Sequence, residues 1–142
     1  MGAVCLGWVL ALTPAAGPLG EAAKKELAAL EGNWALVRFE RRGTVPEADR
    51  PVLTIKGSKW SMPDLGGDFE VIALDPTADP KLIDLRGPSN DGKTRDREGI
   101  YKVDGDTLTV VAYARADKKR PTTFDTPTDP GVNLHVYKRV KK

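Results

Sequence analysis

The spacing of apolar residues changes near residue 32. Between residues 21 and 31, Leu27 and Leu30 lie three positions apart among Ala, Lys and Glu, which predicts a short helix. From Trp34 onward, apolar and polar residues alternate in short runs separated by Gly, Pro, Asp and Ser, which predicts strands. Gly32 follows the helical run and is the expected C-cap, so Gly32-Asn33-Trp34 marks the change from helix to strand.

The alternating part of the chain divides into about eight short strands. Their expected ranges are 34–41, 52–56, 59–62, 69–74, 81–86, 98–103, 107–114 and 132–140. Gly57-Ser58 and Asp104-Gly105 have the composition of two-residue hairpin turns, and Asp-Gly suits the positive φ angles of a type I′ turn. Residues 87–97 and 115–131 are polar and rich in Gly, Pro, Thr or Asp, so they are expected to be loops.

Strands that follow one another without intervening helices favour an all-β, up-and-down antiparallel barrel over a Greek-key sandwich. A length of 142 residues with 30% charged residues fits one globular domain. The strands are short and carry Arg38, Lys56 and Lys102, which excludes a membrane barrel with a uniformly apolar outer face. The formal charge of +2 is spread along the chain and predicts no class of partner.

The first 20 residues differ in composition from the rest. They contain no charged side chain, are apolar from Ala3 to Leu12, and continue with small residues near Ala16. This pattern predicts a signal peptide-like segment over 1–19 and an exported, periplasmic or extracytoplasmic domain over 20–142, with cleavage near Ala16. The Lys or Arg that usually begins such a signal is absent, which leaves the true translation start open. Cys5, the one cysteine, would be removed with the segment.

Three motifs in order carry a resemblance to a known family. They are Leu30-x-Gly32-x-Trp34, residues 99–108 (GIYKVDGDTL) and residues 120–124 (RPTTF). Together they resemble an uncharacterised lipocalin-like domain family, expanded in planctomycete bacteria, with a calycin-type barrel that starts at Gly-x-Trp. The resemblance implies an eight-stranded lipocalin-like barrel with a short N-terminal helix, and export. Many relatives carry Cys in the strand after the Asp-Gly turn, where this chain has Val111, so a redox role of that Cys would not transfer.

By analogy with lipocalins, Trp34 is expected to plug the closed end of the barrel, with a basic residue of the last strand stacked on its ring. Arg139 is the first candidate and Lys138 the second, because strand register cannot be derived from the sequence. Gly32, Trp34 and Arg139 are therefore the expected closure residues. The simpler alternative is a core Trp34 and a solvated Arg139.

Catalytic and metal chemistry find little support. The only histidine, His135, lies between Leu134 and Val136 and is expected to be an outward or hydrogen-bonded strand residue. Glu70, Asp84, Asp96 and Glu98 could form a carboxylate pair, but the sequence does not bring any two together. We therefore expect no enzyme, no metal and no cofactor. The basic residues around Arg120 are few and mixed with acidic ones, so no nucleic-acid partner is expected, and Arg120 is expected to be structural.

The interior of the barrel is the remaining candidate site. Trp60, Phe69, Tyr101 and Tyr113 are expected either to line a pocket or to fill a core. Further wall residues are expected in three pairs: Leu53 and Ile55, Leu108 and Val110, Leu134 and Val136. Two functions follow. The first is binding of a small apolar molecule; the second is a solid-core interaction or scaffold module that contacts another macromolecule through its loops, especially 115–131. The sequence leaves the ligand and the oligomeric state open.

Overall fold

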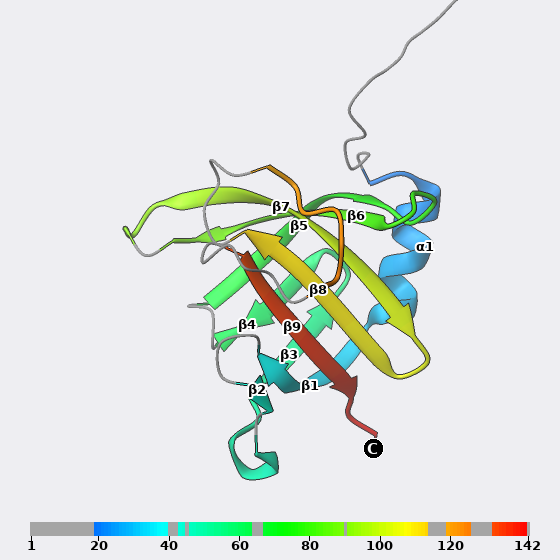
Figure 1. Cartoon of the computed structure of the whole chain (residues 1–142). Helices are drawn as coiled ribbons and strands as arrows, with labels where there is room; N and C mark the ends of the chain where they lie inside the picture. The colour runs from blue at the N-terminus through cyan, green and yellow to red at the C-terminus, as the bar shows by residue number, and fades with distance from the viewer. Residues whose placement is uncertain are drawn as a thin grey trace, which may run out of the picture.

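The computed structural model describes residues 19–39, 43–44, 46–63, 67–89, 91–113, 119–125 and 132–141, without the side chains of residues 43, 44, 47 and 113 (Figure 1). Its helical elements are α1 (Glu21–Leu30) and the 3-10 helix η1 (Glu47–Asp49). The strands are β1 (Gly32–Phe39), β2 (Gly43–Thr44), β3 (Val52–Lys56), β4 (Lys59–Met62), β5 (Gly67–Asp75), β6 (Lys81–Pro88), β7 (Thr94–Asp104), β8 (Thr107–Tyr113) and β9 (Val132–Arg139).

The strands form one closed antiparallel barrel. From β3 to β9 each strand pairs with the next one in sequence, and β1 pairs with β3 on one side and β9 on the other. The closure is visible in the register, because Trp34 of β1 faces both Leu53 of β3 and Arg139 of β9. The two-residue β2 adds a short pairing to β1 outside the eight-stranded ring. The predicted fold class, an up-and-down, lipocalin-like eight-stranded barrel with a short N-terminal helix, is confirmed.

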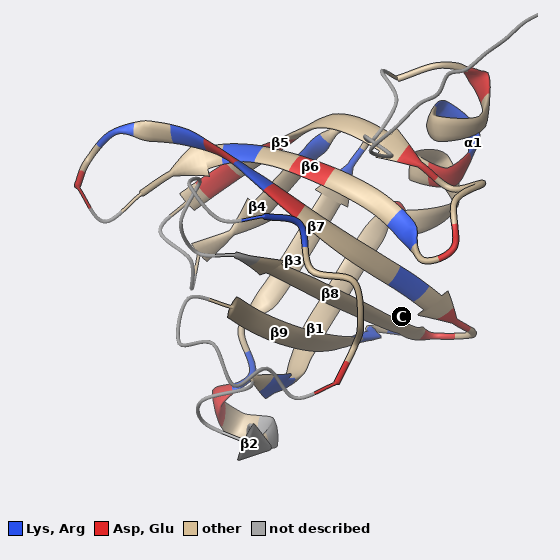
Figure 2. Ribbon diagram, turned by 45° about the horizontal axis from the view of Figure 1, so that its top comes forward, with Lys and Arg blue, Asp and Glu red and all other residues tan. Residues whose placement is uncertain are grey.

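The β6–β7 hairpin is longer than the sequence suggested. Residues 87–97 were expected to be a loop, but β6 continues to Pro88 and β7 begins at Thr94. Figure 2 shows acidic and basic residues along this ribbon, where Arg86 Nε pairs with Asp96 Oδ1 at 2.7 Å across the two strands. Both residues are exposed, so this part of the hairpin has no apolar face to reveal it as a strand. Its polar composition made the loop prediction wrong.

The buried apolar residues form two clusters, one inside the barrel and one on its outer wall. The larger one combines the buried face of α1 with inward side chains of the strands: Trp34, Leu36, Leu53, Ile55, Trp60, Met62, Phe69, Val71, Leu74, Ile83, Leu85, Tyr101, Leu108, Val110 and Tyr137. The smaller one comprises Leu82, Ile100, Val111, Val132 and Leu134, with Ala78, Phe124 and Val136 packed against it. Leu134 and Val136 therefore belong to the outer cluster, and their predicted place in the interior wall is wrong.

The helix α1 packs on the barrel through Ala23, Leu27 and Leu30, all of which are buried in the interior cluster. It begins and ends close to its predicted bounds, but its C-cap is Glu31 and not Gly32. Gly32 instead opens β1 with φ of 131°, a conformation that favours glycine. The glycine therefore serves the sharp change of direction from helix to strand.

The signal peptide-like segment predicted over 1–19 lies outside the described residues except for Leu19, so its expected role stays a prediction. Within the described part of the chain, α1 has 10 residues and no helix has the length and apolar character needed to cross a bilayer.

Candidate ligand site in the barrel interior

Trp34 of β1 and Arg139 of β9 are in contact where the C-terminal end of α1 meets the barrel. The Trp34 side chain is completely buried, and its Nε1 donates a hydrogen bond of 2.9 Å to the Leu30 carbonyl oxygen. The Arg139 guanidinium lies over the indole ring, 4.3 Å from its centroid, and donates to the carbonyl oxygens of Ala29 and Glu31 at 2.9 Å each. Arg139 therefore satisfies carbonyl groups at the end of α1 and covers the Trp34 ring at the same time.

A second contact ties α1 to the barrel. Tyr101 of β7 is fully buried, and its hydroxyl donates to Glu26 Oε2 at 2.8 Å. Lys81 Nζ of β6 donates to the same carboxylate oxygen at 2.8 Å. Burial, assisted by the Glu26 carboxylate, raises the pKa of the Tyr101 phenol, so it remains a neutral donor. The helix is thus fixed to β6 and β7 by one carboxylate.

The middle of the interior is aromatic. Trp60 of β4 and Phe69 of β5 face each other in register, and both are buried. Gly87 of β6 lies beneath the Phe69 ring, because a Cβ at this position would overlap the ring carbons. The Arg97 guanidinium lies 5.3 Å from the Phe69 centroid, and its Nη2 donates to the Pro88 carbonyl oxygen at 2.9 Å. Glycine at residue 87 therefore provides the space that the aromatic ring occupies.

Trp60 and His135 bring polar atoms into this apolar interior. His135 pairs with Val110 of the interior cluster and with Phe39, so its side chain belongs to the inner face. Its ring lies 4.7 Å from that of Phe39 and stacks on Tyr137 at 6.0 Å, with 6% of the residue exposed. Within the part of the chain that the structure describes, neither His135 Nε2 nor Trp60 Nε1 has a hydrogen-bond partner.

Burial lowers the pKa of His135 from 6.5 to about 4, so the imidazole is neutral near pH 7. The expectation that His135 points outward is wrong; of the hydrogen-bonded alternative, the structure shows only that Nε2 has no partner among the described residues. The flanking residues Leu134 and Val136 pack on the outer face of β9, which is covered as well. Their apolar character wrongly suggested that they face the interior and that His135 faces outward.

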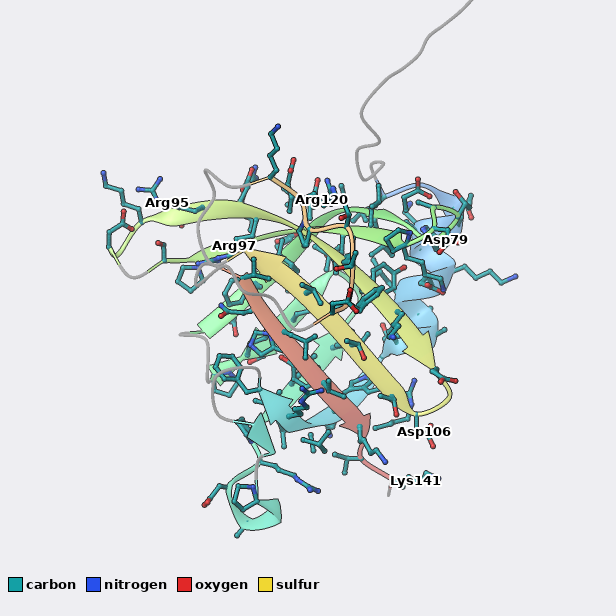
Figure 3. All side chains as sticks on the ribbon, in the orientation of Figure 1. Asp79, Arg95, Arg97, Asp106, Arg120 and Lys141 are labelled. Carbon is teal, nitrogen blue, oxygen red and sulfur yellow. The ribbon has the colours of Figure 1, made fainter. Side chains whose placement is uncertain are left out.

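The cover on the outer face is the segment 119–125. Arg120 Nη1 donates to the carbonyl oxygens of Gly99 and Ile83, at 2.9 and 3.3 Å, and Nη2 forms an ion pair with Asp84 at 2.8 Å. Figure 3 shows Arg120 where this segment crosses β6 and β7. Phe124 packs against the outer cluster, with Lys102 Nζ 4.6 Å from its ring centroid. The structural role expected for Arg120 is confirmed.

The four carboxylates considered for acid–base chemistry each have a nearby polar or charged partner. Asp84 and Glu98 are in register on neighbouring strands and both approach Arg120, and Asp96 pairs with Arg86. Glu70 Oε2 accepts a hydrogen bond of 3.4 Å from Ser58. Burial is the main reason that the pKa of Asp84 is raised, and Arg120 opposes it. Among the described residues, no group of three or more His, Cys, Asp or Glu side chains is placed to hold a metal ion.

Of the expected lining residues, Trp60, Phe69 and Tyr101 all lie in the interior cluster, as do Leu53, Ile55, Leu108 and Val110. Tyr113 pairs with Val132 through its backbone, and its side chain lies outside the description. The sequence-based selection missed Phe39, Tyr137 and His135. Period-two alternation backward from Arg139 would have found Tyr137 and His135, because residues 139, 137 and 135 lie on one face of β9.

The fold and the interior define the class of this protein as a closed, up-and-down eight-stranded barrel with a lipocalin-like architecture. Comparisons with protein-family models, with curated proteins and with solved structures gave no match.

Proposed function

We propose that this protein is a non-catalytic, exported, lipocalin-like barrel that binds a small, largely apolar molecule in its interior. The single observation that carries the proposal is the pair of buried polar atoms, His135 Nε2 and Trp60 Nε1, for which the described residues provide no partner. Buried polar groups in folded proteins are nearly always hydrogen-bonded, since an unsatisfied one costs about 1–3 kcal/mol. A bound molecule would offset this cost.

The surroundings of these two atoms support an apolar ligand body. Trp60 packs in the interior cluster with Phe69 and Val71, and His135 contacts the rings of Phe39 and Tyr137. An apolar lining with a few polar atoms is the usual composition of a small-molecule site. Export is proposed from the composition of residues 1–19, and membership of the lipocalin-like family from the three motifs.

The described part of the 115–131 loop favours this proposal over the interaction module. Within its described residues 119–125, Arg120 and Phe124 both bind the barrel itself. A loop that is used to cover the outer wall has less of its surface left for a partner.

Isothermal titration calorimetry of the full chain with 1-octanol, at several temperatures, tests the proposal. We expect one binding site with a negative heat-capacity change, the mark of apolar burial. Val110→Phe adds bulk beside His135 and should abolish binding, whereas Val140→Phe, at an exposed position, should not. Far-UV circular dichroism checks that both variants fold. The absence of heat in the wild type, or equal binding by both variants, would contradict interior binding.

A further inference from the structure

His135 is an unusual residue to find inside this barrel. Its neighbours on β9, in register on the inner face, are Tyr137 and, across the strand pair, Val110. A residue with only apolar and aromatic contacts would be expected at such a place, because phenylalanine fills a similar volume without a polar atom to desolvate. The imidazole therefore introduces a polar atom at an apolar position and leaves it without a partner among the described residues.

The hydrogen-bonding capacity of this atom limits the ligand. A neutral imidazole has one nitrogen that donates and one that accepts, and the tautomer decides which of these Nε2 is. A hydroxyl group can donate or accept, so it can pair with Nε2 in either tautomer. An ether, ketone or halide cannot donate, and each would match one tautomer at most. Trp60 Nε1 is a donor only, so it also requires an oxygen acceptor from whatever lies beside it.

The neutral state of His135 also favours an uncharged polar group on the ligand. Burial alone lowers the pKa of His135, and no ion pair to His135 occurs among the described residues. A carboxylate placed against a neutral imidazole in an apolar enclosure would be desolvated without a counter-charge from His135. The inner-face cation Arg97 is engaged by the Phe69 ring and the Pro88 carbonyl oxygen.

We propose that His135 Nε2 is the specificity-determining contact of the barrel and that it selects an apolar molecule carrying an uncharged hydroxyl group. This inference rests on the proposed function, that the interior binds a small molecule. The apolar walls contact the apolar body of the ligand, and His135 selects among ligands by their polar group. An alcohol is therefore preferred to an alkyl halide and to a carboxylate of equal length.

Three eight-carbon probes test the preference: 1-octanol, 1-fluorooctane and octanoate. The full chain should bind 1-octanol on the order of 10-fold more tightly than 1-fluorooctane, the difference expected for one hydrogen bond. His135→Phe should reduce that ratio to within about 2-fold without weakening 1-fluorooctane, and His135→Gln, which keeps a donor and an acceptor, should restore part of it. Circular dichroism confirms that the variants fold.

Nitrogen-15 spectra of the imidazole provide a direct readout, because the chain has one histidine and hence one set of imidazole signals. The Nε2 resonance should move on addition of 1-octanol and stay in place with 1-fluorooctane. If octanoate binds as tightly as 1-octanol, if His135→Phe keeps the preference, or if Nε2 does not respond, the inference is wrong while ligand binding stands. If none of the three probes binds, the proposed function fails and the inference with it.

Discussion

Arg139 and Trp34 face each other across the β1–β9 seam of the barrel, with the guanidinium 4.3 Å from the indole centroid. The same guanidinium donates to two carbonyl oxygens at the end of α1, so one side chain joins the last strand, the first strand and the helix. A planar group with several donors can form both hydrogen bonds while stacked, which an ammonium group cannot.

Arg139→Lys should therefore destabilise the protein by about 1–2 kcal/mol, through loss of one carbonyl hydrogen bond and of the stacked contact. Urea unfolding followed by circular dichroism measures the change. Lys141→Ala is a suitable control, because Lys141 is exposed and its pairing with Asp106 should contribute less than about 1 kcal/mol. Equal effects of the two substitutions would show that Arg139 does not close the barrel.

Gly32→Ala should also loosen this closure. The φ of 131° at Gly32 is rarely adopted by other residues, and a Cβ there would lie 3.3 Å from Arg139 Nη1. We expect a loss of about 1–3 kcal/mol in the free energy of unfolding. Gly105→Asn is the matched control, since Gly105 has φ of 61° in open space and asparagine tolerates that conformation. If Gly32→Ala lowers the free energy of unfolding no more than Gly105→Asn does, alanine is not strained at residue 32.

Glu26 should stabilise the packing of α1 more as a hydrogen-bond acceptor than as a charged group. Glu26→Ala removes the acceptor of both Tyr101 and Lys81, whereas Glu26→Gln keeps an acceptor for the Tyr101 hydroxyl. Hydrogen exchange of residues 21–30 should accelerate strongly in the alanine variant and modestly in the glutamine variant. Lys25→Ala, at an exposed position of the same helix, should leave exchange nearly unchanged. Similar acceleration in the two Glu26 variants would assign the role to the ion pair.

Arg120→Met should release the segment 119–125 and cost about 3–5 kcal/mol, because it leaves the half-buried Asp84 carboxylate without its counter-charge. Lys119→Met, exposed and adjacent, should change stability by less than about 0.5 kcal/mol.

The deficit of Arg120→Met should depend on pH with a defined sign. Burial already raises the pKa of Asp84 and Arg120 opposes it, so removal of Arg120 raises the pKa further. A raised pKa means that the folded state binds the proton more tightly than the unfolded state, so the deficit should shrink as the pH falls. A deficit that grows in acid would contradict this assignment.

His135 should make the protein sensitive to acid. Its pKa in the folded protein, about 4, is below the usual 6.5, so the unfolded state binds the proton more tightly between these values. Stability contributed by the neutral imidazole is complete above about pH 6.5 and falls as the pH approaches 4, by on the order of 3 kcal/mol. The difference in unfolding free energy between wild type and His135→Phe should change by this amount from pH 7 to pH 4. A constant difference would show that the imidazole is not buried.

Much of the fold could be predicted because turn chemistry and alternation agreed along most of the chain. Gly57-Ser58 forms the tight turn that its composition indicates, and the stacking of Arg139 on Trp34 followed from the lipocalin analogy. The other tight turn is Gly105-Asp106, one residue later than the predicted Asp104-Gly105, because Asp104 still pairs with Thr107. Only Gly105 of these residues has a positive φ, so the predicted type I′ turn is wrong. The prediction failed at two places where the environment of a strand is unusual. The described residues at the tip of the β6–β7 hairpin, 91–96, are all exposed, and β9 is covered on both faces.

On β9 two expectations were in conflict. If Arg139 faces inward to reach Trp34, alternation places His135 inward and Leu134 and Val136 outward, unless a bulge intervenes. The register of β8 with β9 is continuous from residue 132 to residue 138, so β9 itself contains no bulge; the irregularity of the β1–β9 pairing lies in β1, between Leu36 and Arg38. The cover formed by residues 119–125 could not be foreseen, because a long-range contact between Arg120 and the carbonyl oxygens of β6 and β7 leaves no periodic signal in the sequence.

Isotope-filtered nuclear Overhauser spectra locate a bound molecule relative to the barrel wall and so test interior binding directly. With the full chain and 1-octanol, we expect contacts from the octyl chain to the inner methyl groups of Val71 and Val110. Contacts confined to Leu134 or Val132, in the outer cluster, or no contacts at saturating 1-octanol, would contradict binding inside the barrel.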